Sequence, residues 1–213
     1  YSKQLNTKQN AMKQKQHALA GITAAMLFIS AYWLHSTARP GFSHFTKAVS
    51  ELGSAGAPNA LTWNALGYII PGLLIAYFGV GLHQSVTQGE GGKLPLYGLV
   101  LSGLFLTLSG IFPGDFDNRN SFTMLVHSVG SIGSFVAFLT AAFSYPPFLK
   151  KNPFWEKTIL SSLLLTWLCI FSGFLRSGAM PGIGQRFGFL FYFLWIIYMA
   201  IHLYRFNNHE HSA

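Results

Sequence analysis

Residues 94–112 of the chain read LPLYGLVLSGLFLTLSGIF, a stretch that contains no Asp, Glu, Lys or Arg. An α-helix needs about 20 mostly apolar residues to cross the roughly 30 Å hydrocarbon core of a bilayer. The apolar run is continuous rather than alternating, so it does not fit a transmembrane β-strand. This stretch therefore predicts a membrane-spanning helix.

The same pattern occurs six times, and none of the six segments carries Asp, Glu, Lys or Arg between its ends. The segments are 18–35, 61–82, 94–112, 122–143, 158–175 and 187–204. Aromatic residues near the segment ends, such as Tyr32, Trp33 and Trp63, are typical of membrane interfaces. The sequence predicts an all-α fold: an integral membrane bundle of six transmembrane helices over 18–204, between tails at 1–17 and 205–213.

The composition excludes most soluble classes. Only 9% of the 213 residues are charged and 51% are hydrophobic, whereas a soluble domain carries about 25% charged residues. The net charge of +8 does not indicate a nucleic-acid partner, because the basic residues lie at the ends of apolar segments. The one cysteine excludes an intramolecular disulfide and a Cys-only zinc site.

The positions of Lys and Arg predict the orientation in the membrane. Of the fourteen basic residues, nine fall on the side of both termini: Lys3, Lys8, Lys13, Lys15, Lys93, Lys150, Lys151, Lys157 and Arg205. The other five, Arg39, Lys47, Arg119, Arg176 and Arg186, fall on the opposite side. The side richer in Lys and Arg is usually cytoplasmic, so both termini are expected there. The first apolar segment is interpreted as a retained span rather than a signal peptide.

The first outer loop carries a helical pattern. Its apolar residues recur at helical spacing, at Phe42, Phe45, Val49 and Leu52, and Gly53 can end a helix. Lys47 and Glu51 on the other face are spaced to form an ion pair. This pattern predicts a short amphipathic helix at the bilayer surface or over the end of the bundle.

Candidate catalytic residues lie on the same outer side. His127 falls about two turns inside its segment, and a histidine within the membrane is a functional candidate by default. With Asp115 from the preceding loop, it can form a base or part of a metal site. Ser50 and Glu51 offer a nucleophile or a second base. Each also has an ordinary structural interpretation, since Asp115 can cap a helix and His127 can bond a neighbouring helix.

Candidate ligand-binding residues are the cations of the outer loops and one histidine, namely Arg176, Arg186, Arg119 and His44. Arg176 and Arg186 flank a glycine-rich turn, where two guanidinium groups can hold a phosphate or a carboxylate. Their expected partners are Glu51, Asp115 or Asp117, or an anionic lipid headgroup. Contact with bulk lipid phosphates as generic anchors is the alternative.

Two loop signatures carry a resemblance to a known family. The first is RPGFSH at 39–44, followed by SELG at 50–53 and GAPNA at 56–60. The second is GIFPGD at 110–115, with His127 in the following segment. Together they resemble the bacterial and archaeal membrane family catalogued as domain of unknown function 998, from about residue 18 to about residue 204. The resemblance implies a multi-pass protein of the bacterial inner membrane and implies no particular activity.

The sequence favours a protein that binds a lipid or small amphiphile at an outward-facing polar cup. One alternative is a membrane-embedded lipid hydrolase or transferase that uses Asp, His and Glu, although the common hydrolase motifs are absent. Another is an accessory subunit that docks a membrane-protein partner. The pattern indicates no particular cofactor and no metal.

Overall fold

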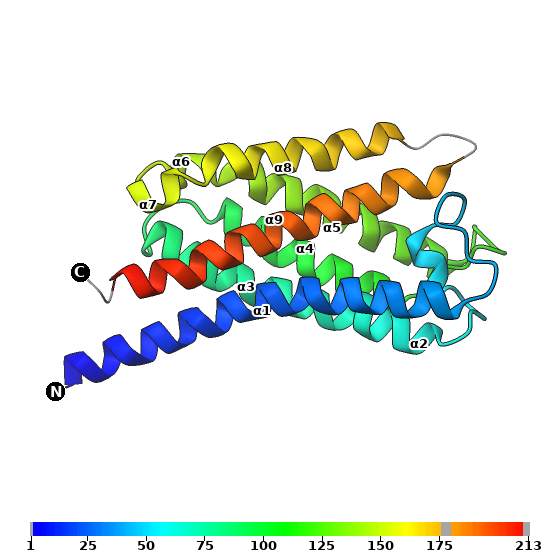
Figure 1. The fold of residues 1–213 in the computed structure, drawn as a ribbon, viewed down its shortest axis with the longest axis horizontal. Helices are drawn as coiled ribbons and strands as arrows, with labels where there is room; N and C mark the ends of the chain where they lie inside the picture. Colours follow the sequence, from blue (N-terminus) through cyan, green and yellow to red (C-terminus); the bar gives the residue numbers. More distant parts are fainter. Residues whose placement is uncertain (1, 176–179, 211–213) are drawn as a thin grey trace.

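The computed structural model describes residues 2–175 and 180–210, and most of these residues lie in helices (Figure 1). The long helices are α1 (Ser2–Ala38), α3 (Ile70–Thr87), α4 (Leu94–Ile111), α5 (Phe122–Ser144), α8 (Ile159–Phe171) and α9 (Pro181–Glu210). Short helices are α2 (Ala60–Trp63), α6 (Pro146–Leu149) and α7 (Pro153–Glu156). Three further helical segments are η1 (Val49–Gly53), η2 (Asn64–Ile69, a π-helix) and η3 (Ser172–Leu175). The described residues contain no strand.

The prediction of an all-α membrane bundle is confirmed. Among the described residues, five helical segments are long and apolar enough to cross a membrane: Ala11–Ala38, Ala60–Thr87, Leu94–Ile111, Phe122–Leu149 and Gly182–Phe206. The sixth expected span, at 158–175, corresponds to a shorter apolar helix, Ile159–Leu175. The count of six spans therefore stays a prediction, as does the division into a membrane domain and two tails.

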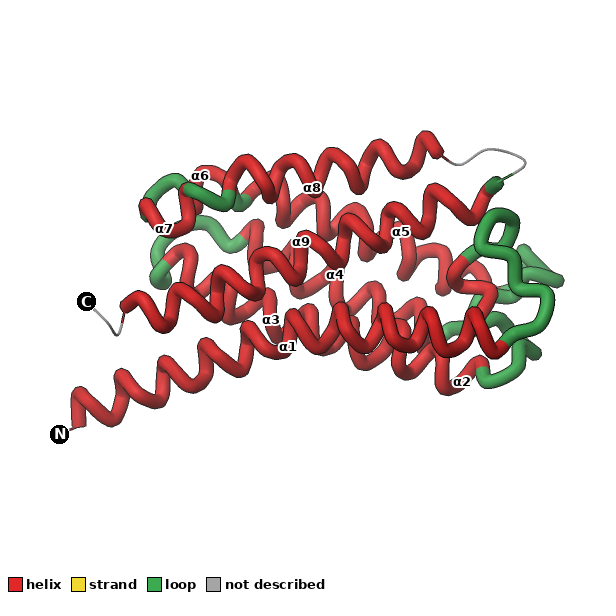
Figure 2. Tube along the Cα trace, viewed as in Figure 1, coloured by secondary structure: helices red, strands yellow, loops and turns green. Residues whose placement is uncertain are grey.

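The long helices run side by side, and the connecting loops gather at the two ends of the bundle (Figure 2). Both chain termini lie at one end (Figure 1). The loop that follows α1 and the start of α9 lie at the other end, which we call the Arg186 end (Figure 1). Helix α1 begins at Ser2 rather than at the edge of the apolar segment, because hydropathy marks only the part of a helix that lies in the bilayer.

Helix α4 packs mainly against α3 and α5, and glycines permit the close approach. A Cβ atom on Gly98 would lie 2.7 Å from the backbone nitrogen of Ala141 and 2.8 Å from the backbone oxygen of Ala137 in α5. Such small residues let backbones meet, which is the usual basis of helix association in membranes. The sequence of α4 thus sets the spacing of the bundle.

Buried hydroxyl groups join α4, α5 and α9. The Tyr192 hydroxyl lies 2.9 Å from Ser102 Oγ, which in turn lies 3.3 Å from Ser134 Oγ. All three residues are buried. In an apolar surrounding each hydroxyl needs a hydrogen-bond partner. This row of hydroxyl groups therefore fixes how the three helices are rotated against one another.

We expect the Tyr192→Phe variant to be less stable than the wild type by about 0.6–1.7 kcal/mol, from the average to the largest value measured for interhelical hydrogen bonds in membranes. The thermal unfolding midpoint in detergent measures this loss. Tyr204→Phe, on the exposed side of the same helix, serves as the control and should leave the midpoint unchanged. Equal midpoints for all three proteins would show that the hydroxyl chain does not stabilise the bundle.

The amphipathic helix expected after Phe42 is not formed as predicted. Only Val49–Gly53 is helical, as a 3-10 helix, and the Phe45 side chain is exposed rather than packed on the core. The backbone groups that an α-helix would use are bonded to α9 instead. The Phe45 oxygen accepts from Gly182 N at 2.9 Å, and Val49 N donates to Gln185 Oε1 at 2.7 Å. Contacts with α9 therefore override the local helical pattern.

Candidate functional site

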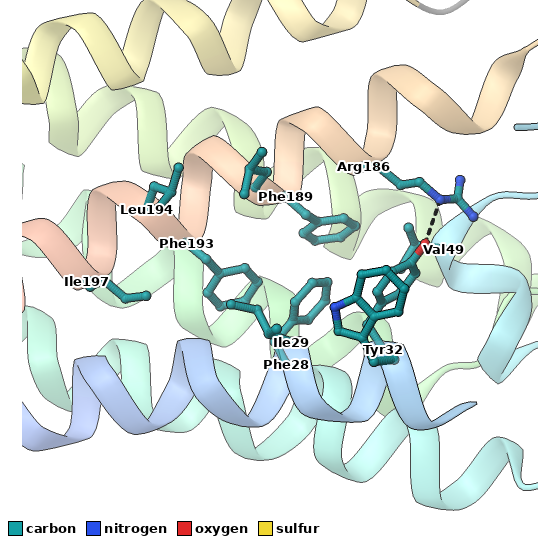
Figure 3. Close-up of a pocket in the computed structure, with 11 residues that line it drawn as sticks. Phe28, Ile29, Tyr32, Val49, Arg186, Phe189, Phe193, Leu194 and Ile197 are labelled. Atoms are coloured by element: carbon teal, nitrogen blue, oxygen red, sulfur yellow. Dashed lines mark hydrogen bonds between the residues drawn. The ribbon is translucent and has the colours of Figure 1, made fainter. Parts of the chain in front are cut away.

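A groove of about 210 Å³ lies between α1 and α9 on the side of the bundle (Figure 3). Its walls are almost entirely apolar side chains. They are Phe28, Ile29, Trp33, Val49, Phe189, Leu190, Phe193, Leu194 and Ile197, with Tyr32 and Arg186 at one end. Apolar pockets with a few convergent polar groups are the usual form of ligand sites. We therefore take this groove as the candidate site.

The side chain of Arg186 is held firmly at the polar end of the groove. Its Nε donates to the Tyr32 hydroxyl at 2.8 Å, as drawn in Figure 3. Its Nη1 donates to the backbone oxygens of Lys47 at 2.7 Å and Gly182 at 2.8 Å. Its Nη2 is buried and has no hydrogen-bond partner among the described residues. All three acceptors are neutral, so the guanidinium is oriented without a carboxylate.

Tyr32 connects Arg186 to His44. The Tyr32 hydroxyl lies 2.5 Å from His44 Nδ1. Because the Tyr32 oxygen accepts a hydrogen bond from Arg186, its own proton is available for His44 Nδ1, which then acts as the acceptor. The imidazole is also surrounded by aromatic rings, with centroids of Tyr32, Trp33 and Phe42 at 5.7, 6.0 and 5.7 Å. Two of the predicted ligand-binding residues, Arg186 and His44, are thus brought together through Tyr32.

The loop after α1 carries the ion pair that its sequence predicts. Lys47 Nζ lies 3.1 Å from Glu51 Oε2, and Glu51 Oε1 accepts from the backbone N–H of Ala48 at 2.8 Å. Arg39 donates to the backbone oxygen of Glu51. The Glu51 carboxylate is therefore engaged within its own loop.

The other candidate residues are separately engaged. His127 is buried in α5 and donates from Nδ1 to the backbone oxygens of Ser109 at 2.9 Å and Phe112 at 3.1 Å. Asp115 Oδ1 accepts from the backbone N–H of Asn118 at 2.9 Å. Ser50 is buried and its side chain is near that of Tyr68. No hydrogen bond or ion pair between described residues joins Asp115, His127 and Glu51.

The remaining predicted positions differ in how much the structure says about them. Asp117 and Arg119 are exposed on the loop before α5. Arg176 lies outside the described residues. Within the described part of the chain, no group of three or more His, Cys, Asp or Glu side chains is placed to hold a metal ion.

Sequence reasoning missed the central position of Tyr32, which it interpreted only as an interfacial aromatic residue. It also missed Gln185, which anchors the loop at Val49. Tyr32 is 154 residues from Arg186, so no local pattern could have linked the two. Trp63 was likewise expected at the interface but is fully buried.

Comparison with known proteins adds a family but no activity. The model of the family described as "Protein of unknown function (DUF998)" matches residues 22–202. No curated protein and no solved structure matches the chain. The matched range holds both loop signatures, and also Tyr32, His44 and Arg186. Because the match spans most of its length, the protein belongs to the DUF998 family.

Proposed function

We propose that this membrane protein binds a lipid or a similar amphiphile, with one acyl chain in the α1–α9 groove and the polar head beside Arg186. The observation that carries the proposal is the groove itself, an apolar channel on the side of the bundle that ends at a charged side chain. A lipid has the same division into an apolar chain and a polar head. The shape and polarity of the groove therefore match those of a lipid.

The dimensions of the groove favour a single chain. Its lining on α9 runs from Arg186 to Ile197, which corresponds to about 17 Å along a helix. That length is close to half of the roughly 30 Å hydrocarbon core, the thickness of one leaflet. The volume of about 210 Å³ is below the roughly 300–1,000 Å³ of sites that enclose a whole small molecule. The rest of the lipid would stay in the bilayer.

We propose that the protein lies in the bacterial inner membrane, with both termini on the cytoplasmic side and the Arg186 end facing outward. The excess of Lys and Arg on the side of the termini supports this orientation. The partners that we propose are membrane lipids, with a membrane-protein partner as a further possibility and no nucleic acid.

The contacts of the described residues favour binding over catalysis. A hydrolase or transferase built on Asp115, His127 and Glu51 would need these side chains to converge on one reacting atom. Each of them is instead bonded to nearby backbone groups. An accessory subunit, the third possibility, has no comparable observation in its favour.

Photo-crosslinking tests the proposal. A phospholipid with a diazirine near the end of one acyl chain is added to the purified protein in nanodiscs, and crosslinked peptides are mapped by mass spectrometry. We expect the groove peptides from α1 and α9 to be labelled more strongly than peptides from the exposed apolar face of α5, which includes Val129, Ile132 and Val136. Equal labelling of the groove and the α5 face would contradict the proposal.

A groove-filling variant makes the test specific. Leu190→Trp places a larger side chain in the groove, and we expect groove labelling to fall about fivefold, which corresponds to a loss of about 1 kcal/mol of chain binding. Leu164→Trp, on the exposed surface of α8, is the matched control and should label as the wild type does. Unchanged labelling in Leu190→Trp would place the bound chain elsewhere.

A further inference from the structure

The guanidinium of Arg186 has no counterion among the described residues. The one ion pair between described residues joins Lys47 and Glu51. Arg186 is half-buried, and its Nη2 is a buried donor without a partner. A buried cation is costly unless an opposite charge or a full set of hydrogen bonds compensates it. The site therefore lacks an acceptor for Nη2 and a negative charge that would compensate the guanidinium.

The elements that form the polar end are also net positive. The loop at 39–53 holds Arg39, Lys47 and one acid, Glu51, and residues 182–197 of α9 hold Arg186 and no acid. Glu51 is already paired with Lys47 and bonded to Ala48 N. The ring faces of Tyr32 and Phe42 lie 5.7 and 5.5 Å from the guanidinium carbon, which keeps it stacked in place. A negative ligand would compensate this excess, and a cationic group would be repelled.

We infer that the groove selects lipids whose phosphate headgroup carries a net negative charge over lipids whose headgroup also carries an ammonium. This inference rests on the proposed lipid binding and adds the class of headgroup. The phosphate oxygen would accept from Arg186 Nη2, the nitrogen that has no partner. Because this nitrogen is buried, its engagement requires a shift of the Arg186 side chain or of the groups that cover it.

Tyr32 and His44 have a positioning role in this arrangement. The Tyr32 oxygen accepts a hydrogen bond from Arg186 Nε, and the Tyr32 hydroxyl donates its own proton in a hydrogen bond to His44 Nδ1. Nη1 is occupied by two backbone oxygens. Nη2 is the guanidinium nitrogen that has no partner among the described residues, so the site would bind a phosphate through this one nitrogen rather than hold a carboxylate with two nitrogens.

The test uses the same crosslinking assay with two lipids that carry the same photoreactive chain, phosphatidylglycerol and phosphatidylcholine. Groove labelling is divided by α5-face labelling for each lipid, which removes general differences in bilayer composition. We expect the wild type to favour phosphatidylglycerol by about tenfold, since each nearby basic side chain attracts an anionic headgroup. Arg186→Gln should reduce this preference to about twofold or less.

Matched variants separate headgroup selection from anchoring of the loop. Gln185→Ala removes the neutral anchor between α9 and Val49 and should keep the preference. Arg186→Lys keeps the charge and should keep most of it. If Gln185→Ala removes the preference as completely as Arg186→Gln does, Arg186 acts only through the loop, and the inference is wrong.

The outcomes also distinguish this inference from the proposed function. Equal groove labelling by both lipids in the wild type overturns the headgroup inference and leaves lipid binding intact. Absence of groove labelling by either lipid overturns the proposed function. Soluble glycerol phosphate, added as a competitor, should not displace the labelled lipid. Displacement would show that the site binds a free phosphate compound, and the lipid headgroup assignment would be wrong.

Discussion

The Gly98→Leu variant is expected to lose the folded bundle. A Cβ atom at this position would lie 2.7 and 2.8 Å from backbone atoms of Ala141 and Ala137, and 3.0 Å from the Ala141 Cα. Backbone atoms cannot move aside as the end of a flexible side chain can, so α4 and α5 would have to separate. Overpacking of this kind costs about 1–3 kcal/mol in adaptable cores and more where the neighbours are rigid. We expect a loss above about 3 kcal/mol, at the severe end of single substitutions.

Size-exclusion chromatography in detergent, followed by a thermal unfolding scan, measures this effect. We expect little monodisperse Gly98→Leu protein under conditions in which the wild type is stable. Gly173→Leu is the matched control, because a Cβ atom on Gly173 would meet no atom within 4 Å. A monodisperse Gly98→Leu protein with an unchanged unfolding midpoint would show that α4 and α5 are not packed through their backbones at this point.

The sequence predicts the membrane bundle well because hydropathy acts locally. A continuous apolar run must form a helix in lipid, where every backbone polar group needs an internal partner. The span at 94–112 is accordingly found as Leu94–Ile111. Helix ends are predicted less well, as α1 shows, because a helix can continue into water beyond the bilayer without any change in hydropathy that would mark its end.

Tertiary contacts explain why the loop after α1 was predicted less well than the spans. The spacing of Phe45, Val49 and Leu52 is typical of an α-helix, but α9 bonds the backbone of this loop at Phe45 and Val49. These partners lie more than 130 residues away in the chain. A pattern within ten residues carries no information about them.

The candidate site, too, could be predicted only in part from the sequence. The residues Arg186 and His44 were predicted from their type and their side of the membrane, and those properties are visible in the sequence. The groove and the bridging role of Tyr32 arise only when α1 and α9 pack together. Side-chain chemistry can therefore be proposed from the sequence, whereas convergence depends on helix packing.

His127 is the residue whose role most clearly separates a structural from a catalytic explanation. Helix α4 ends at Ile111, so the last carbonyl groups of α4 have no partner within the helix. His127 reaches across from α5 and donates to the carbonyls of Ser109 and Phe112. In return, Ser109 Oγ donates to the backbone oxygen of His127 at 3.2 Å. The imidazole thus caps the end of α4 from a neighbouring helix.

We expect His127→Leu to lower the free energy of unfolding by about 1–3 kcal/mol, because two carbonyl groups lose their donor in an apolar surrounding. His127→Asn should recover much of this loss, since the asparagine amide can place a donor near the position of Nδ1. The thermal unfolding midpoint in detergent is the measurement, with His202→Leu as the control. Among the described residues, the hydrogen bond of His202 is to the oxygen of Tyr198 in its own helix, and that oxygen is already part of the helical ladder.

The comparison between the leucine and asparagine variants decides the role of His127. A cap requires only a donor of the right length, whereas a catalytic base or a metal ligand requires the second ring nitrogen, which asparagine lacks. Recovery of stability in His127→Asn, together with unchanged lipid labelling of the groove, would assign His127 to the architecture of the bundle. An unfolding midpoint for His127→Leu equal to that of the wild type would refute the cap. A histidine is costly to place within a membrane. The buried imidazole would then have to be explained by a role other than the cap.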